Sequence, residues 1–503
     1  MKPALISSKP LRKVSSTLFL VLASIAIFTF VGGLIYSYSQ FPQAILRAIF
    51  ILLAAIVGLI LVFWLLRKTA LGAALIVLVV PFEQFATPVK IGPVSISLKL
   101  VTLVTLLVFV TLSTSIIVGK RKISKRILLA LFIPLLILIT SFISSVISSR
   151  EPFVSLESWS YQLFLVAFLF LLPHSLRRLR DFEISFKAMA VASLVVSVYG
   201  MFQLVALRFS IPDPLVSRGF LKPLEDTYGI AKITSFQANP NPFAGYLVST
   251  LFVILTVFLY QWRSNHKARF YLFCILIIFL TFLLTMSRSG MFGLICGSLA
   301  LLTISRGGKK FGKLPWNSII SFAGLLLTLG AVSLFFTPQG QTIINQFLSR
   351  TTLAQSSTDY HLDFARGAFA MFRDRPILGW GVNQFKPVYL SDYSPYPWLV
   401  SANTHSMFLT ILSETGIIGL FSHFLLIIYF ALAIRKGLRA AGRGTFQFYI
   451  LAGLTAGYVA ILTGNIFYDY YFNEFVWVYF GLLLAVIQFA LRQKAEAQQA
   501  LSI

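Results

Sequence analysis

The chain has 503 residues, of which 57% are hydrophobic and only 12% are charged, and its mean hydropathy is +0.85. A soluble protein carries about twice that charged fraction, so the composition excludes a soluble globular domain. The net charge of +26 would suggest a nucleic-acid partner, but the basic residues lie in short stretches between long apolar runs, which makes them a topology signal instead.

Apolar runs of nearly 20 residues recur along the whole chain, and they predict an all-α, polytopic transmembrane helix bundle of about 12–14 spans. The shortest runs, 69–83 and 159–173, fit the length of a span least well. In chain order the predicted spans are 17–37, 44–66, 69–83, 97–118, 127–147, 159–173, 184–206, 242–262, 270–286, 289–305, 317–336, 405–434, 446–464 and 474–491.

The spans and the segments between them divide the chain into four predicted parts. Residues 1–206 form N-terminal transmembrane helices, and residues 207–336 form central helices with a cationic external loop and a hairpin at Arg288. Residues 337–402 form a large external loop, and residues 403–503 form the C-terminal helices and a short tail. Because a bundle needs only short turns between its helices, the long external segments are where function is expected.

The basic residues predict the orientation of the bundle. Most of the 42 lysines and arginines fall on alternate connections, which are therefore expected to be cytoplasmic, together with both termini. The acidic residues do the reverse, since only three of the 16 fall on that side: Asp181, Glu183 and Glu496. The loop at 337–402 and the hairpin at Arg288 then lie outside the cell membrane.

The external loop is expected to contain an amphipathic helix over residues 359–372, lying on the outer membrane surface. One face of this helix is apolar and consists of Phe364, Ala368, Met371 and Phe372. Aromatic residues follow it at Tyr389, Tyr393, Tyr396 and Trp398. Such rings suit sugars or lipid headgroups, or form an interfacial aromatic belt. Within this loop we expect substrate contacts from Arg366, Tyr393 and Trp398.

Two residues stand out as candidates for chemistry. His405 ends the large loop and is predicted to begin the next helix, with Asn403 as its N-cap. Arg288 lies between two apolar runs at the external membrane edge, beside Ser289 and Gly290, which allow another group to approach. The alternatives are a packing or capping histidine and an arginine that snorkels to the interface.

Further cationic groups and a helix start come from the preceding external segment. Lys232 and Arg218 are candidate diphosphate ligands, although solvated surface charges would look the same. The sequence 239–242, Asn-Pro-Asn-Pro, is expected to stop the loop and start a helix whose N-terminal amides face outward. Helix N-termini and guanidinium groups are the groups that bind diphosphates. No nucleotide loop, DxD motif or Cys/His cluster is present, so no metal or other cofactor is expected.

Four segments carry a resemblance to a known family. In chain order they are AKITSFQANPNPFAGYL, LTMSRSGMFGL, RGAFAMFRDRPILGWGVNQF and NTHSMFLTILSETGIIGL. Their order and spacing resemble the signature segments of the O-antigen ligase and O-antigen polymerase superfamily, over roughly residues 230–480. The resemblance implies a bacterial inner-membrane glycosyltransferase of lipopolysaccharide or polysaccharide biosynthesis that uses a glycan carried on undecaprenyl diphosphate.

The resemblance also implies roles for particular residues. Arg288 corresponds to an essential arginine of the helical hairpin, and His405 to the histidine that ends the large periplasmic loop. Lys232 stands where the family usually has another arginine, so the charge is kept but the bidentate fork is lost. His361 or Tyr360 stands near the position of a further family arginine, and no role is carried over to either.

The expected reaction is inverting, metal-independent transfer of the glycan to a hydroxyl of a glycan, lipid or protein acceptor at the periplasmic face. Arg288 and Lys232 would neutralise the leaving diphosphate, and His405 would either accept the hydroxyl proton or bind diphosphate. The first alternative is a repeat-unit polymerase of the same superfamily. An alternative of another class is a transporter or flippase for a lipid-linked glycan or small anion.

Overall fold

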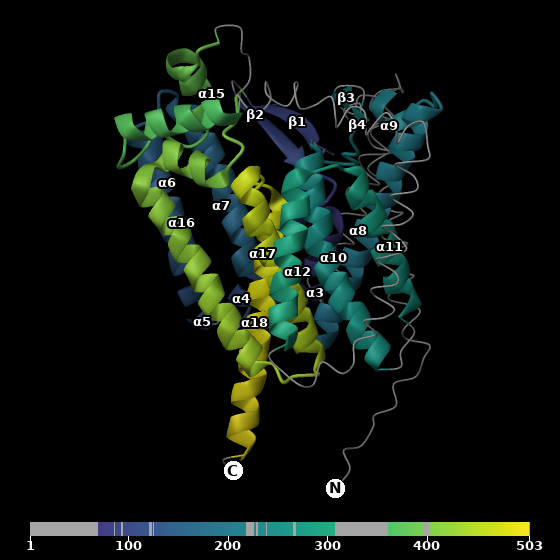
Figure 1. Ribbon diagram of the computed structural model, residues 1–503. Coiled ribbons are helices and arrows are strands. Elements are labelled where there is room, and N and C mark those ends of the chain that lie inside the picture. The colour runs from purple at the N-terminus through teal and green to yellow at the C-terminus, as the bar shows by residue number, and fades with distance from the viewer. Residues whose placement is uncertain are drawn as a thin grey trace, which may run out of the picture.

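The computed structural model describes residues 69–84, 86–91, 94–119, 123, 125–217, 226–227, 230–237, 239–264, 268–306, 361–396 and 402–501 (Figure 1). The helices are α3 (Thr69–Val79), α4 (Leu100–Ile117), α5 (Lys125–Ala130), α6 (Phe132–Ile147), α7 (Pro152–Ser175), α8 (Leu179–Arg208), α9 (Pro214–Ser217), α10 (Pro240–Arg263), α11 (Arg269–Leu284), α12 (Arg288–Arg306), α15 (Phe385–Val388), the π-helical turn η1 (Tyr389–Tyr393), α16 (Met407–Ala440), α17 (Phe446–Phe467) and α18 (Glu474–Leu501). A further helix covers residues 361–374.

The described residues confirm the predicted helical transmembrane bundle. Among them, nine helices are long and apolar enough to cross a membrane, and α3 and α11 are shorter apolar helices. The predicted spans 17–37, 44–66 and 317–336 lie outside the described residues. The span predicted at 159–173 was too short, because α7 begins at Pro152 and has 24 residues. The fixed φ of proline suits the first turn of a helix, so the apolar run alone marked the start too late.

Two short β-hairpins add to the helices. Strands β1 (Ala86–Ile91) and β2 (Val94–Lys99) pair antiparallel, with Ala86 opposite Lys99 and Ile91 opposite Val94. Strands β3 (Asp226–Thr227) and β4 (Ile230–Ala231) form a second, smaller pair in the external segment before α10. The apolar-run analysis did not anticipate either hairpin. Both lie at the same end of the bundle in Figure 1, outside the long helices.

The centre of the bundle is formed by α10, α17 and α18. In these helices 89%, 72% and 94% of the apolar window is buried, against 22% in α12 and 33% in α16. Small residues explain the close packing of α17 against α12 and α10. A Cβ atom added to Gly293 would lie 2.8 Å from the carbonyl oxygen of Ala460, and one added to Gly457 would lie 2.8 Å from that of Ser249. Small residues allow this approach of helix backbones in membranes.

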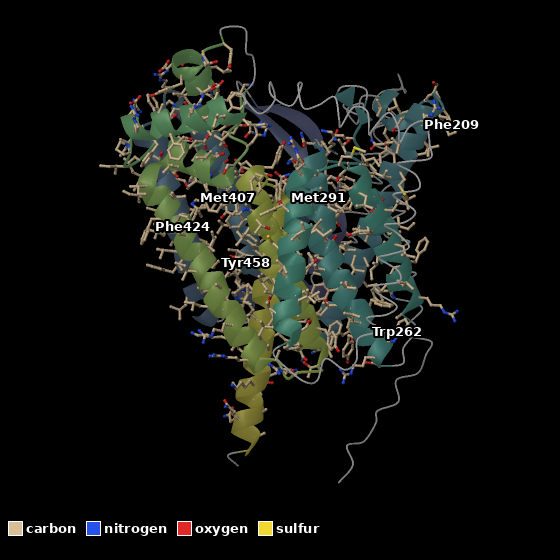
Figure 2. All side chains as sticks on the ribbon, in the orientation of Figure 1. Phe209, Trp262, Met291, Met407, Phe424 and Tyr458 are labelled. Atoms are coloured by element: carbon tan, nitrogen blue, oxygen red, sulfur yellow. The ribbon has the colours of Figure 1, made fainter. Side chains whose placement is uncertain are left out.

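The long helices run alternately up and down, so the connections fall at two ends. We call the end with the β-hairpins, residues 361–396 and His405 the loop end (Figure 1). We call the end with the α7–α8, α10–α11 and α16–α17 connections the basic end, since these carry arginines. Figure 2 shows Met291 and Met407 toward the loop end and Trp262 toward the basic end, with carbon-rich side chains between. Arg288 and His405 therefore lie at one end, as the alternation of spans predicted.

Residues 361–396 form a small domain with its own core. Its buried side chains come from the helix at 361–374, from α15 and η1, and from the segments between and after them: Phe364, Ala368, Met371, Trp380, Phe385, Val388, Tyr389 and Ala402. The helix was predicted correctly. Its predicted placement was wrong, because Ala368 and Met371 are completely buried against this core instead of facing the outer membrane surface. An amphipathic helix can pack its apolar face against either a membrane surface or a protein core, so the sequence pattern does not distinguish the two placements.

The small domain is attached to α16 through a break in that helix. Gly416 has φ of 65° and interrupts the helix that was predicted as one continuous span. Backbone groups of residues 376–381 pair with α16 around this glycine, because Gly381 N donates to the Glu414 carbonyl oxygen at 2.8 Å and Ile417 N donates to that of Pro376 at 2.9 Å. The Glu414 carboxylate accepts hydrogen bonds from Asn383 N at 2.9 Å and from Phe385 N at 3.1 Å. The domain is therefore held rigidly above the start of α16.

Candidate active site

Arg288 is the first residue of α12 and its side chain is exposed at the loop end. The turn between α11 and α12 ends at Ser287, whose hydroxyl accepts a hydrogen bond from Gly290 N at 3.2 Å and donates one to Asn241 Oδ1 at 2.7 Å. A Cβ atom added to Gly290 would lie 2.8 Å from the Cβ of Ala244. The first turns of α12 and α10 are therefore in direct contact, which explains why a glycine follows the arginine.

Two helix N-termini consequently lie side by side next to Arg288. The helix α10 begins at Pro240, as the sequence 239–242 predicted, and Asn239 caps it, because its side chain accepts a hydrogen bond from Asn241 N at 2.9 Å. In α10, Pro240 and Pro242 have no N–H and the N–H of Asn241 is bonded to Asn239, so this helix contributes only the partial positive charge of its dipole. The first amides of α12 lack carbonyl partners within their helix. Together with the guanidinium group of Arg288, this arrangement favours an anion with several oxygen atoms, such as a diphosphate.

His405 lies in a turn before α16 and does not begin the helix, so the predicted start was wrong. Its φ is 52°, in the left-handed region that few residues other than glycine adopt. Asn403 does not cap the helix either, because its Oδ1 accepts a hydrogen bond from His405 N at 2.9 Å. The residue that precedes the helix is Ser406, with φ of −153°. Such a local asparagine turn fixes the backbone and holds the imidazole away from the helix axis.

The imidazole of His405 packs against aromatic rings from two other segments of the chain. Its centroid lies 4.2 Å from that of His361, at 79°, and 6.0 Å from that of Phe364, both on the helix at 361–374. On another side the ring of Tyr468, in the α17–α18 connection, lies 5.6 Å away. These contacts bring together residues that are more than 40 positions apart in the sequence.

Electrostatics links this histidine pair to Arg288. Burial and, next, the nearby His361 lower the pKa of His405 to about 4. Burial also lowers the pKa of His361, and the positive charge of Arg288 lowers it further. The structure therefore places Arg288, His361 and His405 close enough to interact. Both imidazoles are neutral near pH 7, so each has a ring nitrogen that accepts a proton.

An acidic residue that sequence reasoning missed lies behind His405. Thr410 donates a hydrogen bond to Asp469 Oδ2 at 2.6 Å, and the hydroxyls of Thr404 and Thr410 are 2.6 Å apart. Asp469 Oδ1 is buried and has no hydrogen-bond partner among the described residues. Burial raises the pKa of Asp469 to about 6. The sequence did contain a signal for Asp469, because it is an acidic residue between two tyrosines, in the short α17–α18 connection of a chain with few acidic residues.

The remaining predicted site residues are spread around the loop end. Lys232 follows β4 and is half-buried, and the neighbouring Ser235 is bonded to Gln203 of α8 through its backbone N at 2.9 Å. Arg218 and Trp398 lie outside the described residues.

Two predicted substrate residues form polar contacts within the small domain. Arg366 is exposed and pairs with Asp363 at 3.2 Å, and the hydroxyl of Tyr393 bonds to Asp374. Tyr389 is completely buried, so its ring belongs to the domain core and not to an aromatic surface.

A cationic and aromatic stack on the outer side of the small domain was also not predicted. The ring of Trp380 lies between two guanidinium groups, 3.9 Å from that of Arg375 and 4.9 Å from that of Arg150. Arg150 also forms an ion pair with Asp392 of η1. Because Arg150 precedes α7, this stack joins the domain to the bundle at a second point. Sequence spacing gives no signal for the contact of Arg150, since it lies more than 200 positions from Arg375, Trp380 and Asp392.

Residues 272–424 match the family model described as O-antigen ligase. This segment is similar to an O-antigen ligase domain. It begins in α11, contains Arg288, His361 and His405, and ends within α16. The match confirms the resemblance to the O-antigen ligase and polymerase superfamily, a family of membrane glycosyltransferases that act on lipid-linked glycans. No curated protein sequence matches the chain.

Proposed function

We propose that this O-antigen ligase-like protein transfers a glycan from an undecaprenyl-diphosphate carrier to an acceptor hydroxyl at the periplasmic face of the bacterial inner membrane. In this orientation the loop end is periplasmic and both termini are cytoplasmic. The observation that carries the proposal is the neutral histidine pair, His361 and His405, beside the guanidinium group of Arg288. A proton acceptor and an anion site at one end of a membrane bundle are the two groups that such a transfer needs.

The donor diphosphate is assigned to Arg288 and the adjoining helix N-termini. The hydrogen bond from Ser287 to Asn241 keeps α10 and α12 in register, so the first amides of α12 and the guanidinium group of Arg288 are fixed before the donor arrives. Preorganised groups of this kind stabilise developing negative charge without rearranging during the reaction. Lys232, on the same end of the bundle, is proposed as a second cation for the diphosphate, with Arg218 as a third. The undecaprenyl chain would remain in the bilayer.

The proposed reaction is a single displacement. The acceptor oxygen forms a bond to the anomeric carbon while the bond from that carbon to the diphosphate oxygen breaks, and the diphosphate leaves with the electron pair. The anomeric configuration is therefore inverted. The proton of the acceptor hydroxyl passes to His405. No general acid is needed, because the diphosphate leaving group is a stable anion near neutral pH.

The lowered pKa of His405 favours the role of base over that of diphosphate ligand. A base must be neutral before reaction, and burial together with His361 keeps the imidazole in that form. A cationic ligand would have to carry a proton beside the guanidinium group of Arg288 and the ring of His361. Asp469 is a positioning residue in this scheme, since its hydrogen bond to Thr410 holds the turn that contains His405.

The acceptor is assigned to the small domain. Arg366 and Tyr393 lie on it, and the domain is attached rigidly to α16 through Glu414. A rigid platform next to the base would set the distance between the acceptor oxygen and the donor, which is a large part of the rate in transfer reactions. We propose that Arg366, with Trp398, contacts the acceptor glycan.

The experiment that tests this function uses the purified protein in liposomes with a lipid-linked glycan and a separate acceptor. A ligase yields one glycan unit on the acceptor, whereas a polymerase yields lengthened glycan on the carrier when the acceptor is omitted. An Arg288→Ala protein that folds and inserts normally is the control. Failure to form either product with several donors and acceptors would contradict the proposed function.

A further inference from the structure

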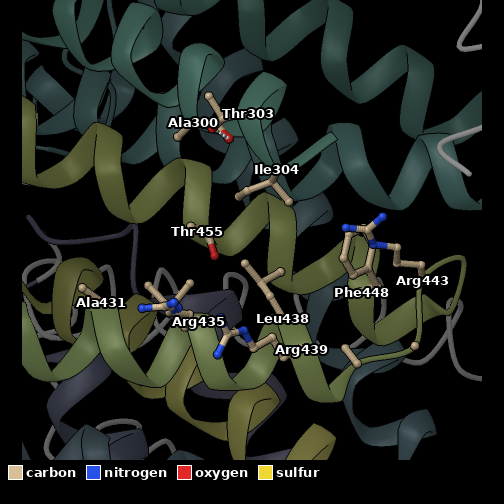
Figure 3. Close-up of a pocket in the computed structure, with 13 residues that line it drawn as sticks. Ala300, Thr303, Ile304, Ala431, Arg435, Leu438, Arg439, Arg443, Phe448 and Thr455 are labelled. Atoms are coloured by element: carbon tan, nitrogen blue, oxygen red, sulfur yellow. Dashed lines mark hydrogen bonds between the residues drawn. The ribbon is translucent and has the colours of Figure 1, made fainter. Parts of the chain in front are cut away.

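A cavity of about 980 Å³ lies between α12, α16 and α17, far from the candidate active site. It is toward the basic end of the bundle, and Figure 3 shows its lining. Arg435 and Arg439 come from the last turns of α16, and Arg443 comes from the connection to α17. Nothing in the transfer reaction proposed above uses these residues.

The three arginines give the mouth of the cavity a strong positive charge. Arg435 and Arg439 are one helical turn apart and project from the same face of α16, as Figure 3 shows, and Arg443 also lines the cavity. All three side chains are exposed, and no aspartate or glutamate lines the cavity within the described part of the chain. Like charges held this close repel each other, so a bound anion would stabilise the arrangement.

Behind the arginines the wall is apolar and extends into the membrane. Ala300, Ala431 and Ile434 line it, each on a helix that crosses the bilayer. Thr455 is the innermost polar residue and lies nine positions after the start of α17, which is about 14 Å along the helix axis. This depth is about half the hydrocarbon thickness of a bilayer, which matches the length of an acyl chain within one leaflet.

We propose that this cavity binds an anionic phospholipid from the leaflet at the basic end. The arginines bind the phosphate of the headgroup, and an acyl chain lies along the apolar wall of α12 and α17. A basic pocket between transmembrane helices on the cytoplasmic side is the arrangement that recognises anionic headgroups. The lipid would fill the gap between α16 and the rest of the bundle, and so would stabilise the helix whose other end follows the turn of His405.

The chain offers a charge-matched control. Lys436 is adjacent to Arg435 on α16 but does not line the cavity, and Lys494 is exposed near the end of α18. The Lys436→Gln/Lys494→Gln variant removes the same net charge from the same end as Arg435→Gln/Arg439→Gln. Both double variants should therefore show any effect of overall charge on lipid association. Only the arginine variant should show an effect of binding in the cavity.

The test measures binding of phosphatidylglycerol and of phosphatidylcholine to the full-length protein in detergent by native mass spectrometry, and thermal unfolding with each lipid. Phosphatidylglycerol should bind the wild-type protein more tightly, and loss of each arginine should weaken it about fivefold, or about 25-fold for the pair. The lysine double variant should bind as the wild type does. Ala431→Trp, which fills the acyl part and leaves every charge, should also weaken lipid binding.

Soluble glycerol phosphate separates a lipid site from a simple phosphate site. It carries the headgroup charge without acyl chains, so it should displace phosphatidylglycerol only at far higher concentration. Equal binding of the two lipids, equal loss in both double variants, displacement by glycerol phosphate at the lipid's own concentration, or unchanged lipid binding in Ala431→Trp would each overturn the proposal.

Discussion

Glycan transfer should stay nearly constant as the pH falls from 8 to about 5, because the pKa of His405 is lowered to about 4. The neutral imidazole is the active form in the proposed reaction, so activity is lost only as the pH falls through that pKa. At pH 5.5 about 97% of His405 would then be neutral, whereas a histidine with the ordinary pKa of about 6.5 would be only about 10% neutral. The two cases differ about tenfold in rate.

A variant of His361 tests why the pKa of His405 is lowered. His361 lowers the pKa of His405 after burial does, so His361→Gln should move the acidic limb of the pH profile to higher pH while the rate near pH 8 changes little. Initial rates would be measured from pH 4.5 to 8 at saturating donor, with circular dichroism at each pH to show that the protein remains folded. A rate that rises as the pH falls would refute the role of base, as would normal transfer by His405→Ala.

Three further predictions follow from the geometry. Arg288→Ala should lower the transfer rate about a hundred- to a thousandfold without unfolding the protein, since one preorganised charge contact is worth about 3–4 kcal/mol. Arg288→Lys should also be impaired. A near-normal rate in Arg288→Ala would contradict the assignment of the diphosphate to Arg288. Glu414→Gln should lower the stability of the small domain by about 1–3 kcal/mol, because glutamine has one acceptor oxygen for the two backbone N–H groups of Asn383 and Phe385 and leaves one buried N–H without its acceptor. Hydrogen exchange at residues 383–385 would measure the change, and unchanged protection would contradict it. An impermeant thiol reagent should label Ser391→Cys in intact cells and Ser264→Cys only after permeabilisation, and the reverse pattern would invert the orientation.

Much of the fold was accessible from sequence because a lipid environment leaves few alternatives. Every backbone polar group in a bilayer must be satisfied within its own helix, so apolar runs predict spans well. The alternation of spans then placed Arg288 and His405 at one end. Sequence patterns did not predict the break in α16 at Gly416, because this glycine looks like any other small residue in an apolar helix.

The composition of the site was only partly predictable. The pairing of His361 with His405 and the position of Asp469 depend on how separate connections meet above the bundle, which no local spacing reveals. The amphipathic helix at 361–374 shows the same limit, since its apolar face could be read from the sequence but not what it packs against. The structure shows what the apolar face packs against, since the ring of Phe364 on this helix contacts the buried ring of Tyr389.

Release of free undecaprenyl diphosphate is the most direct test of the central claim, that the protein breaks the bond between glycan and carrier. The purified protein would be incubated with the lipid-linked glycan and an acceptor in the absence of ATP, and free carrier and transferred glycan would be quantified together. The account predicts equal amounts of the two, and neither with Arg288→Ala. Movement of intact lipid-linked glycan across the liposome membrane, without release of the carrier, would contradict it and would identify a transporter.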